Sequence, residues 1–300
     1  MILGFEFALC ELLSEIIFMN YSNYLLIATT LLFIVFAHSN QPPSTPYSQD
    51  VGLTYLLFSY TAMCEPSVIE SWSCKRCSEY FPTATSPRVY YHNATDIIGY
   101  SVIYNNTIIA VFKGTTGFLN VIVDIEFLRK DYPNVPGAKV HDGFYDSWLD
   151  VRSQVQEGIT NQFKECPDCS LFVTGHSMGG AISTFCTLEL LDWFPNVPLF
   201  TYTYGSPRVG NNVFAEYYNS RQPNTWRVTN QKDLVPHLPP QESVNEYHHV
   251  PNEIWYPHNV TSYVICDDSG EDPSCSDSVN PLEYSIKYHL EYFGQDCNCV

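Results

Sequence analysis

The segment with the clearest chemical meaning is the pentapeptide Gly175-His176-Ser177-Met178-Gly179, which fits the pattern Gly-x-Ser-x-Gly. At a sharp turn between a strand and a helix, such a serine projects its hydroxyl out of the sheet, and the two glycines remove Cβ atoms that would clash. An apolar run over 170–175 and a helix-forming run over 181–190 provide that context. A buried serine in a glycine-rich turn is the alternative, which the flanking pattern disfavours. We therefore predict a nucleophile at Ser177, beside a helix N-terminus that favours an oxyanion.

A serine nucleophile needs a base and an orienting acid, and in α/β-hydrolases these follow the serine in the order acid, then histidine. Asp233 fits the acid because it follows a short predicted strand over 226–229 and precedes a loop. Glu216 falls in a predicted helix and Glu242 in a proline-rich loop. The order therefore indicates Asp233.

The base must come from one of the histidines that follow. His289 is placed on a C-terminal element that could fold back over the strand edge. His237 lies too close to Asp233 in sequence for an easy fit, although proximity alone does not exclude it, and His258 is a further candidate by order. For the remaining histidines near these motifs a structural role is favoured: His141, His176 with local hydrogen bonds, His248 and His249.

Strands and helices alternate along the chain, which predicts an α/β fold with a largely parallel central sheet flanked by helices. Asn105-Asn106 between two β-branched runs predicts a hairpin. An exposed strand or two is expected within 246–256, and a C-terminal helix over 281–293. Apolar spacing predicts helices over 51–64, 144–163 and from 181 to about 193, and strands over 97–104, 107–112, 171–174, 199–204 and 226–229.

Composition limits the partners of the chain. It has 300 residues, 45% of them hydrophobic, and a formal net charge of −18. So acidic a chain is unsuited to nucleic acid or to electrostatic capture by anionic membranes, so any lipid contact must be hydrophobic. We predict one domain over residues 51–300, preceded by an extended Pro/Ser-rich tail over 40–50.

The N-terminus resembles a targeting signal. The uncharged apolar run over 25–37 matches a signal-peptide core and is short for a transmembrane helix, which needs about 20 residues. Ala37 and Ser39 have the spacing of a cleavage site, so we predict a leader over 1–39. Translation could instead start at Met19. The alternative to a cleaved leader is an uncleaved membrane anchor. Three N-glycosylation sequons agree with a secreted protein, at Asn93, Asn105 and Asn259.

Several stretches of the chain occur together in the order typical of one enzyme family: Val111–Thr115, Val140–Phe144, Val173–Gly180, Tyr204–Asn211, Asp233–Pro240, Tyr247–Val250 and His289–Gly294. Through these stretches the chain resembles a class 3 (fungal-type) lipase of the α/β-hydrolase superfamily over roughly residues 50–297. The resemblance implies Ser177, Asp233 and His289 as catalytic residues, and the N–H groups of Thr115 and Met178 as the oxyanion hole. Lys113 stands where the family usually has arginine.

The resemblance also places a short helical lid between Thr115 and Tyr132. Apolar side chains there alternate with Asp124 and Glu126. An apolar lid face is costly to expose to water and stable against lipid, which predicts interfacial activation. An ordinary amphipathic surface helix is the alternative. The predicted lid residues are Val121, Ile122, Ile125, Phe127 and Leu128.

The eleven cysteines are interpreted mainly as disulfides because the chain is predicted to be secreted. Zinc or redox sites are the alternative for the two Cys-x-x-Cys units. Cys186 is predicted to be a buried free thiol, and Cys10 lies in the leader. The expected bridges are Cys74–Cys77, Cys166–Cys169, Cys266–Cys275, and Cys64 with either Cys297 or Cys299.

We therefore predict a secreted, monomeric serine esterase that hydrolyses lipid esters at an oil–water interface, with triacylglycerol as the first expectation. It is expected to need no cofactor or metal. Phospholipase A1 or feruloyl-type esterase activity on the same scaffold, and a non-catalytic lipid-binding protein, are the alternatives.

Overall fold

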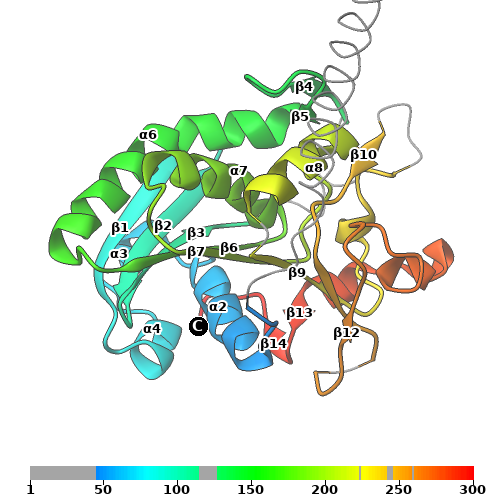
Figure 1. The fold of residues 1–300 in the computed structure, drawn as a ribbon. Coiled ribbons are helices and arrows are strands. Elements are labelled where there is room, and N and C mark those ends of the chain that lie inside the picture. The colour runs from blue at the N-terminus through cyan, green and yellow to red at the C-terminus, as the bar shows by residue number, and fades with distance from the viewer. Residues whose placement is uncertain (1–44, 115–126, 223, 242–245, 259) are drawn as a thin grey trace, which may run out of the picture. The chain divides into compact units, whose positions relative to one another are not determined.

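An eight-stranded sheet forms the centre of the protein, with the strand order β1-β2-β3-β6-β7-β9-β11-β12 (Figure 1). The computed structural model describes residues 45–114, 127–222, 224–241, 246–258 and 260–300. The predicted leader over 1–39 lies outside these ranges. The strands are β1 (Thr85–His92), β2 (Ile97–Tyr104), β3 (Thr107–Phe112), β6 (Ser170–His176), β7 (Leu199–Tyr204), β9 (Thr225–Asn230), β11 (Glu253–Tyr256) and β12 (Val264–Ile265).

The centre of the sheet is parallel from β3 through β6, β7 and β9 to β11. Antiparallel strands complete it on both sides, with β1 and β2 next to β3 and β12 next to β11. The predicted α/β-hydrolase fold with a largely parallel sheet is therefore confirmed. The predicted hairpin is also confirmed, because β2 and β3 pair around Asn105 and Asn106, which both have positive φ.

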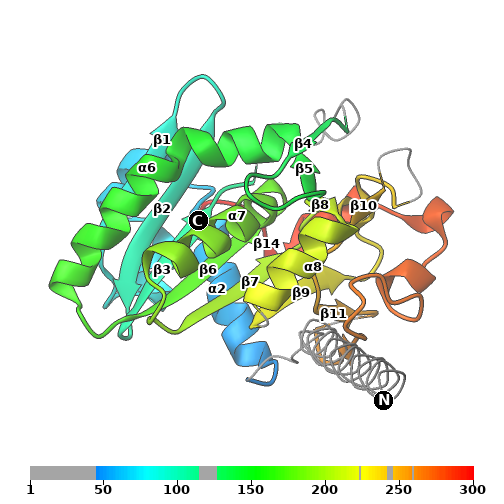
Figure 2. The ribbon, with the colours of Figure 1, turned by 45° about the horizontal axis from the view of Figure 1, so that its top comes forward.

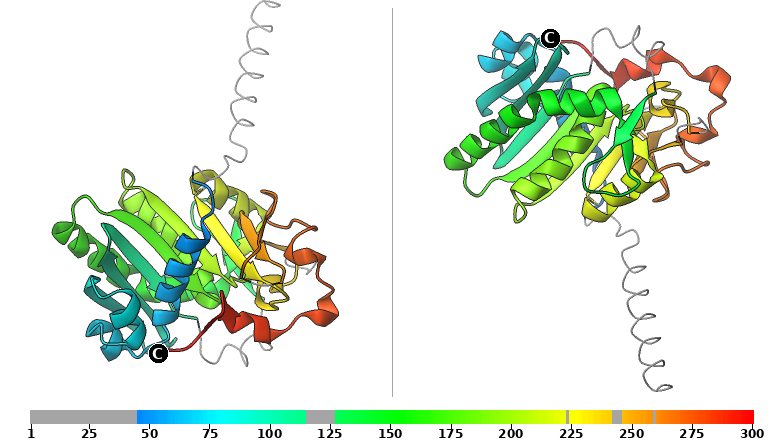
Figure 3. Two further views of the ribbon diagram at one scale, coloured as in Figure 1. Left: turned by 90° about the horizontal axis from the view of Figure 1, so that it is seen from below. Right: turned by 90° about the horizontal axis from the view of Figure 1, so that it is seen from above.

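Helices cover both faces of the sheet (Figures 2 and 3). Helices α6 (Asp142–Glu165), α7 (Met178–Trp193) and α8 (Asn212–Arg221) lie on one face, and α2 (Gln49–Thr61) crosses the other. Side chains of β3 alternate between the two layers. Ala110 and Phe112 belong to the core under α6 and α7, whereas Ile109 and Val111 belong to the core under α2. Burial on both faces explains the nearly continuous apolar sequence of this strand.

Smaller elements lie around the central sheet. A second sheet has the order β10-β8-β5-β4. Between α2 and β1 along the chain are the short helices α3 (Pro66–Glu70) and α4 (Lys75–Tyr80). The second sheet contains β4 (Arg129–Asp131), β5 (Lys139–His141), β8 (Gly210–Asn211) and β10 (Tyr247–His248).

The C-terminal segment differs from the sequence prediction. Instead of one helix over 281–293, it forms two 3-10 turns and a hairpin. Long-range contacts override local propensity here, because the N–H of Ser285 bonds to the carbonyl of Lys232 and residue 285 forms a β-bridge with Asp233. The elements are η3 (Pro281–Glu283), η4 (Ile286–His289), β13 (Glu291–Tyr292) and β14 (Gln295–Asp296).

Two further expectations need correction. Strand β11, within the segment expected to be exposed, is largely buried because it pairs with β9. The predicted tail over residues 40–50 is wrong at its end, where Tyr47 is buried against Tyr202 and Trp226 and α2 begins at Gln49.

Four disulfides join residues that the structure describes, and they confirm the expected bridges. Cys64 pairs with Cys299 rather than Cys297, and thereby ties the end of the chain to the segment after α2. Among the described residues, Cys186, which is buried as predicted, and Cys297 are free thiols. The other three bridges are Cys74–Cys77, Cys166–Cys169 and Cys266–Cys275.

Removal of the long-range bridge should destabilise the protein far more than removal of a short one. The double substitution Cys64→Ser with Cys299→Ser opens a loop of sequence separation 235, and chain entropy predicts a loss of about 5 kcal/mol. The matched control Cys74→Ser with Cys77→Ser opens a separation of 3 and should lose about 2 kcal/mol. Urea unfolding measures both, and equal losses would contradict the prediction.

Candidate active site

Ser177 lies in the turn between β6 and α7 and is only 3% exposed. Its backbone has φ 60° and ψ −132°, a strained conformation for a residue with a side chain, costing roughly 1–3 kcal/mol. The turn is held because the N–H of Ser177 bonds to the carbonyl of Tyr204 at 2.9 Å. Such strain is typical of a functional turn.

The two glycines of the pentapeptide permit close backbone approach at this turn. A Cβ added to Gly179 would lie 2.0 Å from the carbonyl oxygen of Phe112, and one added to Gly175 would lie 2.3 Å from backbone atoms of Gly179. Neither contact is possible for a real side chain. The strand, turn and helix around Ser177 therefore require glycine at both positions, as the sequence predicts.

Asp233 and His289 form a hydrogen-bonded pair in the interior. The Nδ1 atom of His289 lies 2.9 Å from Oδ2 of Asp233, and Asp233 is completely buried. The same carboxylate accepts the hydroxyl of Tyr292 at 2.6 Å and the N–H of Val235 at 2.9 Å. Several donors thus satisfy the carboxylate, and a carboxylate acceptor selects the His289 tautomer protonated at Nδ1.

The segment around His289 is fixed by the end of β9. The Nδ2 atom of Asn230 donates to the carbonyls of Tyr288 at 3.0 Å and Glu291 at 2.7 Å. One side chain thus satisfies the backbone on both sides of His289. The hydroxyl of Tyr292 also accepts the N–H of Asn230 at 3.3 Å.

His289 lies directly beside the Ser177 turn. The rings of His289 and His176 are 4.3 Å apart between centroids, and His176 immediately precedes the serine. Nε2 of His176 donates to the carbonyl of His289 at 2.8 Å. The expected local hydrogen bond of His176 is therefore wrong, since its partner is 113 residues away. Burial holds the pKa of His176 well below its usual range.

The structure describes only part of the predicted oxyanion hole and lid. Met178 is the first residue of α7, where backbone N–H groups point out of the helix N-terminus. Gly114 packs on the turn, since a Cβ there would lie 3.1 Å from Cβ of Ser177. Phe127 is half-buried and Leu128 is 55% exposed. Four predicted residues lie outside the described ranges: Thr115, Val121, Ile122 and Ile125.

The other acid and histidine candidates have different partners. Nδ1 of His237 lies 3.1 Å from Asp277, and Nε2 of His249 bonds to the carbonyl of Pro236. Nε2 of His248 bonds to the carbonyl of Ser269, and His141 caps α6 through the N–H of Phe144. Glu216 accepts from Asn212 on α8, and Glu242 lies outside the described ranges.

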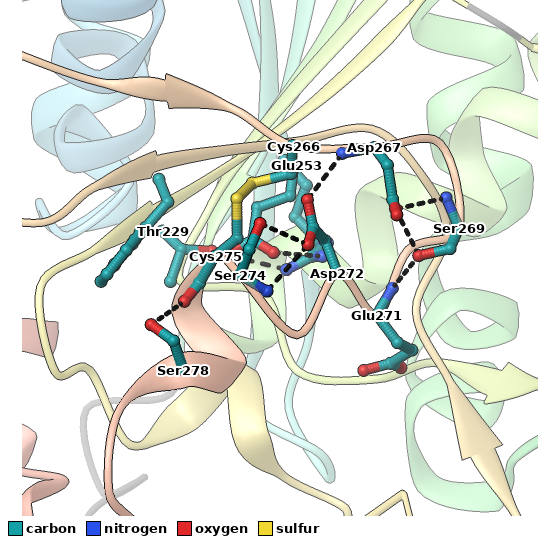
Figure 4. Close-up of a disulfide and its surroundings, with 12 residues drawn as sticks. Thr229, Glu253, Cys266, Asp267, Ser269, Glu271, Asp272, Ser274, Cys275 and Ser278 are labelled. Carbon is teal, nitrogen blue, oxygen red and sulfur yellow. Dashed lines mark hydrogen bonds and ion pairs between the residues drawn. A yellow bond between two sulfur atoms is a disulfide. The ribbon is translucent and has the colours of Figure 1, made fainter.

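One group of potential metal ligands occurs among the described residues, at Cys266, Asp272 and Cys275 (Figure 4). The two sulfur atoms are bonded to each other in a disulfide. The Asp272 carboxylate accepts the N–H groups of Asp267 and Ser274 and the hydroxyl of Ser274. These groups are therefore used to shape the loop rather than directed at an ion.

Three residues of this site were not predicted from the sequence: Asn230, Tyr292 and Gly205. Gly205 has φ +55°, and a Cβ there would lie 2.8 Å from both Asp233 Oδ2 and His289 Nδ1. The motifs Tyr204–Asn211 and His289–Gly294 contain Gly205 and Tyr292, and they are the signal that could have found them. No motif or local sequence pattern marks Asn230 as part of the site.

Two of the predicted glycosylation residues are described. Asn93, in the turn after β1, and Asn105, at the β2–β3 turn, are exposed. Asn259 lies outside the described ranges.

A serine at a strand-to-helix turn, beside an aspartate–histidine pair on a mostly parallel sheet, defines an α/β-hydrolase architecture. The family profile described as Lipase (class 3) matches residues 109–243. The chain is 30% identical over 261 residues to secreted mono- and diacylglycerol lipase A of Penicillium cyclopium, covering 82% of each protein. The chain therefore belongs to the class 3 lipase family.

Two further comparisons agree with this membership. A lipase of Rhizomucor miehei is 36% identical over 75% of this chain, which spans only 62% of that protein. A solved triacylglycerol lipase, described as having a serine protease triad as its catalytic centre, is 33% identical with a TM-score of 0.74. That match covers 84% of this chain and 97% of the solved one.

Gly205→Ala should destabilise the protein beyond the effect of backbone strain. The new Cβ would push apart Asp233 and His289, so we expect a loss of about 2–5 kcal/mol. Gly294→Ala is the matched control, because Gly294 also has positive φ, +67°, but nothing lies within 4 Å of its added Cβ. The control should lose only about 1–2 kcal/mol. Thermal unfolding compares them, and equal losses would contradict the expected clash.

Proposed function

We propose that this protein is a secreted serine esterase that hydrolyses carboxylic esters of lipids, with triacylglycerols as the first substrate class. The observation that carries the proposal is the buried Asp233–His289 pair at 2.9 Å, held against the residue that precedes the strained Ser177. Membership of the class 3 lipase family supports the choice of ester. Phospholipids and feruloyl esters are the alternative substrates on the same scaffold.

In the proposed mechanism, Nε2 of His289 takes the proton of Ser177 Oγ as that oxygen attacks the ester carbonyl. Asp233 holds the Nδ1–H tautomer and stabilises the imidazolium that forms. His289 then returns the proton to the departing alcohol, leaving an acyl group on Ser177. A water molecule, deprotonated by His289, hydrolyses this acyl-enzyme and releases the fatty acid.

The developing oxyanion would be bound by the N–H groups of Thr115 and Met178. The position of Met178 at the start of α7 supports its part, since helix N-termini favour negative charge. Thr115 follows Gly114, which packs on the Ser177 turn. One such donor is worth roughly 2.7–4 kcal/mol in other hydrolases.

We propose contact with a lipid surface through the apolar segment Val121, Ile122, Ile125, Phe127 and Leu128. The exposed side chain of Leu128 at its end supports this. Of the described helices, none is both long and apolar enough to cross a bilayer. We propose that this apolar segment lets the protein reach its substrate at an oil–water interface.

Secretion is proposed from the leader over 1–39 and from the four disulfides. Exposed Asn93 and Asn105 are available for glycosylation. The catalytic unit is proposed to be a monomeric domain over residues 51–300 that needs no cofactor.

Ser177→Ala should abolish ester hydrolysis, and a serine-directed phosphonate should label the native protein at residue 177. Hydrolysis of tributyrin, triolein, phosphatidylcholine and methyl ferulate, measured side by side, identifies the substrate class. Triolein and tributyrin should be hydrolysed fastest. Folded native protein that takes no label would favour the non-catalytic lipid-binding alternative.

Interfacial activation should appear as a sharp rise in rate when tributyrin passes its solubility limit. The physical reason is that each large apolar side chain needs about 1.5–3 kcal/mol to be exposed to water, and a droplet removes that cost. A rate that rises smoothly through the limit would contradict the proposed lid.

Tyr292→Phe should lower kcat/KM for tributyrin roughly tenfold, because the Asp233 carboxylate loses a donor at 2.6 Å and hydrogen bonds to charged groups are worth about 1.5–3 kcal/mol. The matched control is Tyr218→Phe, whose buried hydroxyl bonds to Thr225 at the start of β9. The control should lose stability but keep kcat/KM. Equal kcat/KM values in the two variants would contradict a role for Tyr292.

A further inference from the structure

A second chain of hydrogen bonds reaches His289 from the end of the polypeptide. Sγ of Cys297 lies 3.5 Å from Nδ1 of His176, and Nε2 of His176 donates to the carbonyl of His289 at 2.8 Å. His176 is only 4% exposed. In the proposed mechanism, Ser177 is the nucleophile, Asp233 the orienting acid and His289 the base. Neither Cys297 nor His176 has a role in these steps.

The partners of His176 fix its tautomer. A carbonyl oxygen can only accept, so Nε2 must carry the proton, and the Nδ1 of a neutral ring is then an acceptor. The remaining donor is the S–H group of Cys297. Burial lowers the pKa of His176 well below its usual range, and burial raises the pKa of Cys297 to about 12 despite the attraction of Arg76. A neutral thiol donating to a neutral imidazole is consistent with both directions.

The carbonyl that His176 binds belongs to the last residue of the 3-10 turn η4. Carbonyls at the end of a helical turn lack donors within the turn and need outside partners. Asn230 supplies the donor for Tyr288 of this turn, and His176 supplies the donor for His289. The same Asn230 amide also donates to the carbonyl of Glu291, which lies in β13 just beyond the turn. The backbone that carries the His289 imidazole is therefore held from the ends of both β6 and β9.

Aromatic rings enclose His176 and leave it little freedom to move. Its ring packs edge-on against Tyr60 at 5.3 Å and Tyr292 at 5.7 Å, and lies 4.3 Å from the ring of His289. A displacement of His176 would be transmitted to the backbone of His289 by the hydrogen bond and to its ring by contact.

We propose that His176 is a positioning residue for His289, and that the Cys297 thiol holds His176 in the tautomer that this role requires. The inference rests on the proposed function, because it assumes that His289 is the base. Neither side chain is proposed to touch substrate. Loss of either contact should therefore lower kcat, which depends on the placement of the imidazole relative to Ser177, and leave KM nearly unchanged.

The first test compares His176→Gln with His176→Phe, using kcat and KM for tributyrin. Glutamine keeps an N–H donor for the His289 carbonyl, whereas phenylalanine keeps only the ring volume. Phenylalanine should lower kcat about tenfold with KM within about twofold, and glutamine should restore kcat to within about threefold of the native value. Native kcat in the phenylalanine variant, or equally low kcat in both folded variants, would overturn the proposal.

The second test compares Cys297→Ser with Cys297→Val, which remains decisive if the His176 variants fail to fold. Serine retains a donor and should stay within about twofold of native kcat, whereas valine should lose about threefold or more. Cys186→Ser controls for loss of the other free thiol, which lies in α7, and should retain native kcat. Equal kcat in the serine and valine variants would overturn the role of the thiol.

Phosphonate labelling separates failure of this inference from failure of the proposed function. If native protein takes the label at Ser177 but the His176→Phe and Cys297→Val variants keep native kcat, the inference alone is wrong. If folded native protein takes no label, the proposed function itself is wrong, and the positioning role falls with it.

Discussion

The site depends on one constraint: the segment that carries His289 must be held against the ends of two strands that come much earlier in the chain. Its partners Asp233 and His176 precede it by 56 and 113 residues. His289 is not part of the sheet. Its ring is fixed by Asp233, its own carbonyl by His176, and the neighbouring carbonyls by Asn230. Since isolated 3-10 turns are short and weak, the position of this imidazole is set almost entirely by long-range hydrogen bonds.

The strand order explains why the partners meet at one edge of the sheet. Strands β6, β7 and β9 are parallel neighbours, so their carboxyl ends lie side by side. Ser177 follows β6, Gly205 follows β7, and Asp233 comes three residues after β9. The middle position is a glycine because Asp233 and His289 occupy the space that a side chain would fill. The arrangement thus needs a nucleophile, a residue without a side chain and an acid after the ends of three successive strands.

The sequence predicts those parts of the fold that have a local cause. Strands β3 and β6 are buried on both faces, so their sequences are nearly continuous apolar runs that can be recognised. The glycines around Ser177 are required by close backbone contacts. The C-terminal 3-10 turns were not predictable, because contacts with residues 230–233 outweigh helix propensity in that segment.

The same limit applies within the site. Two features depend on where the C-terminal hairpin β13–β14 packs. One is the pairing of Cys64 with Cys299 rather than Cys297, and the other is the hydrogen bond from His176 to the distant carbonyl of His289. The order of motifs nevertheless indicated Asp233 and His289, because chain order in this fold class follows from strand order.

The distribution of positive charge favours neutral lipids among the candidate substrates. The chain has 14 Lys and Arg against 32 Asp and Glu. Two of its arginines are buried in ion pairs, Arg208 with Glu271 and Arg227 with Glu253. Other arginines pair with acids at the surface: Arg88 with Glu165, Arg152 with Glu189 and Arg221 with Asp192. These five arginines already pair with acids, and acids outnumber cations in the whole chain. Both features disfavour an anionic phosphate head group and support acylglycerols over phospholipids as the proposed substrate.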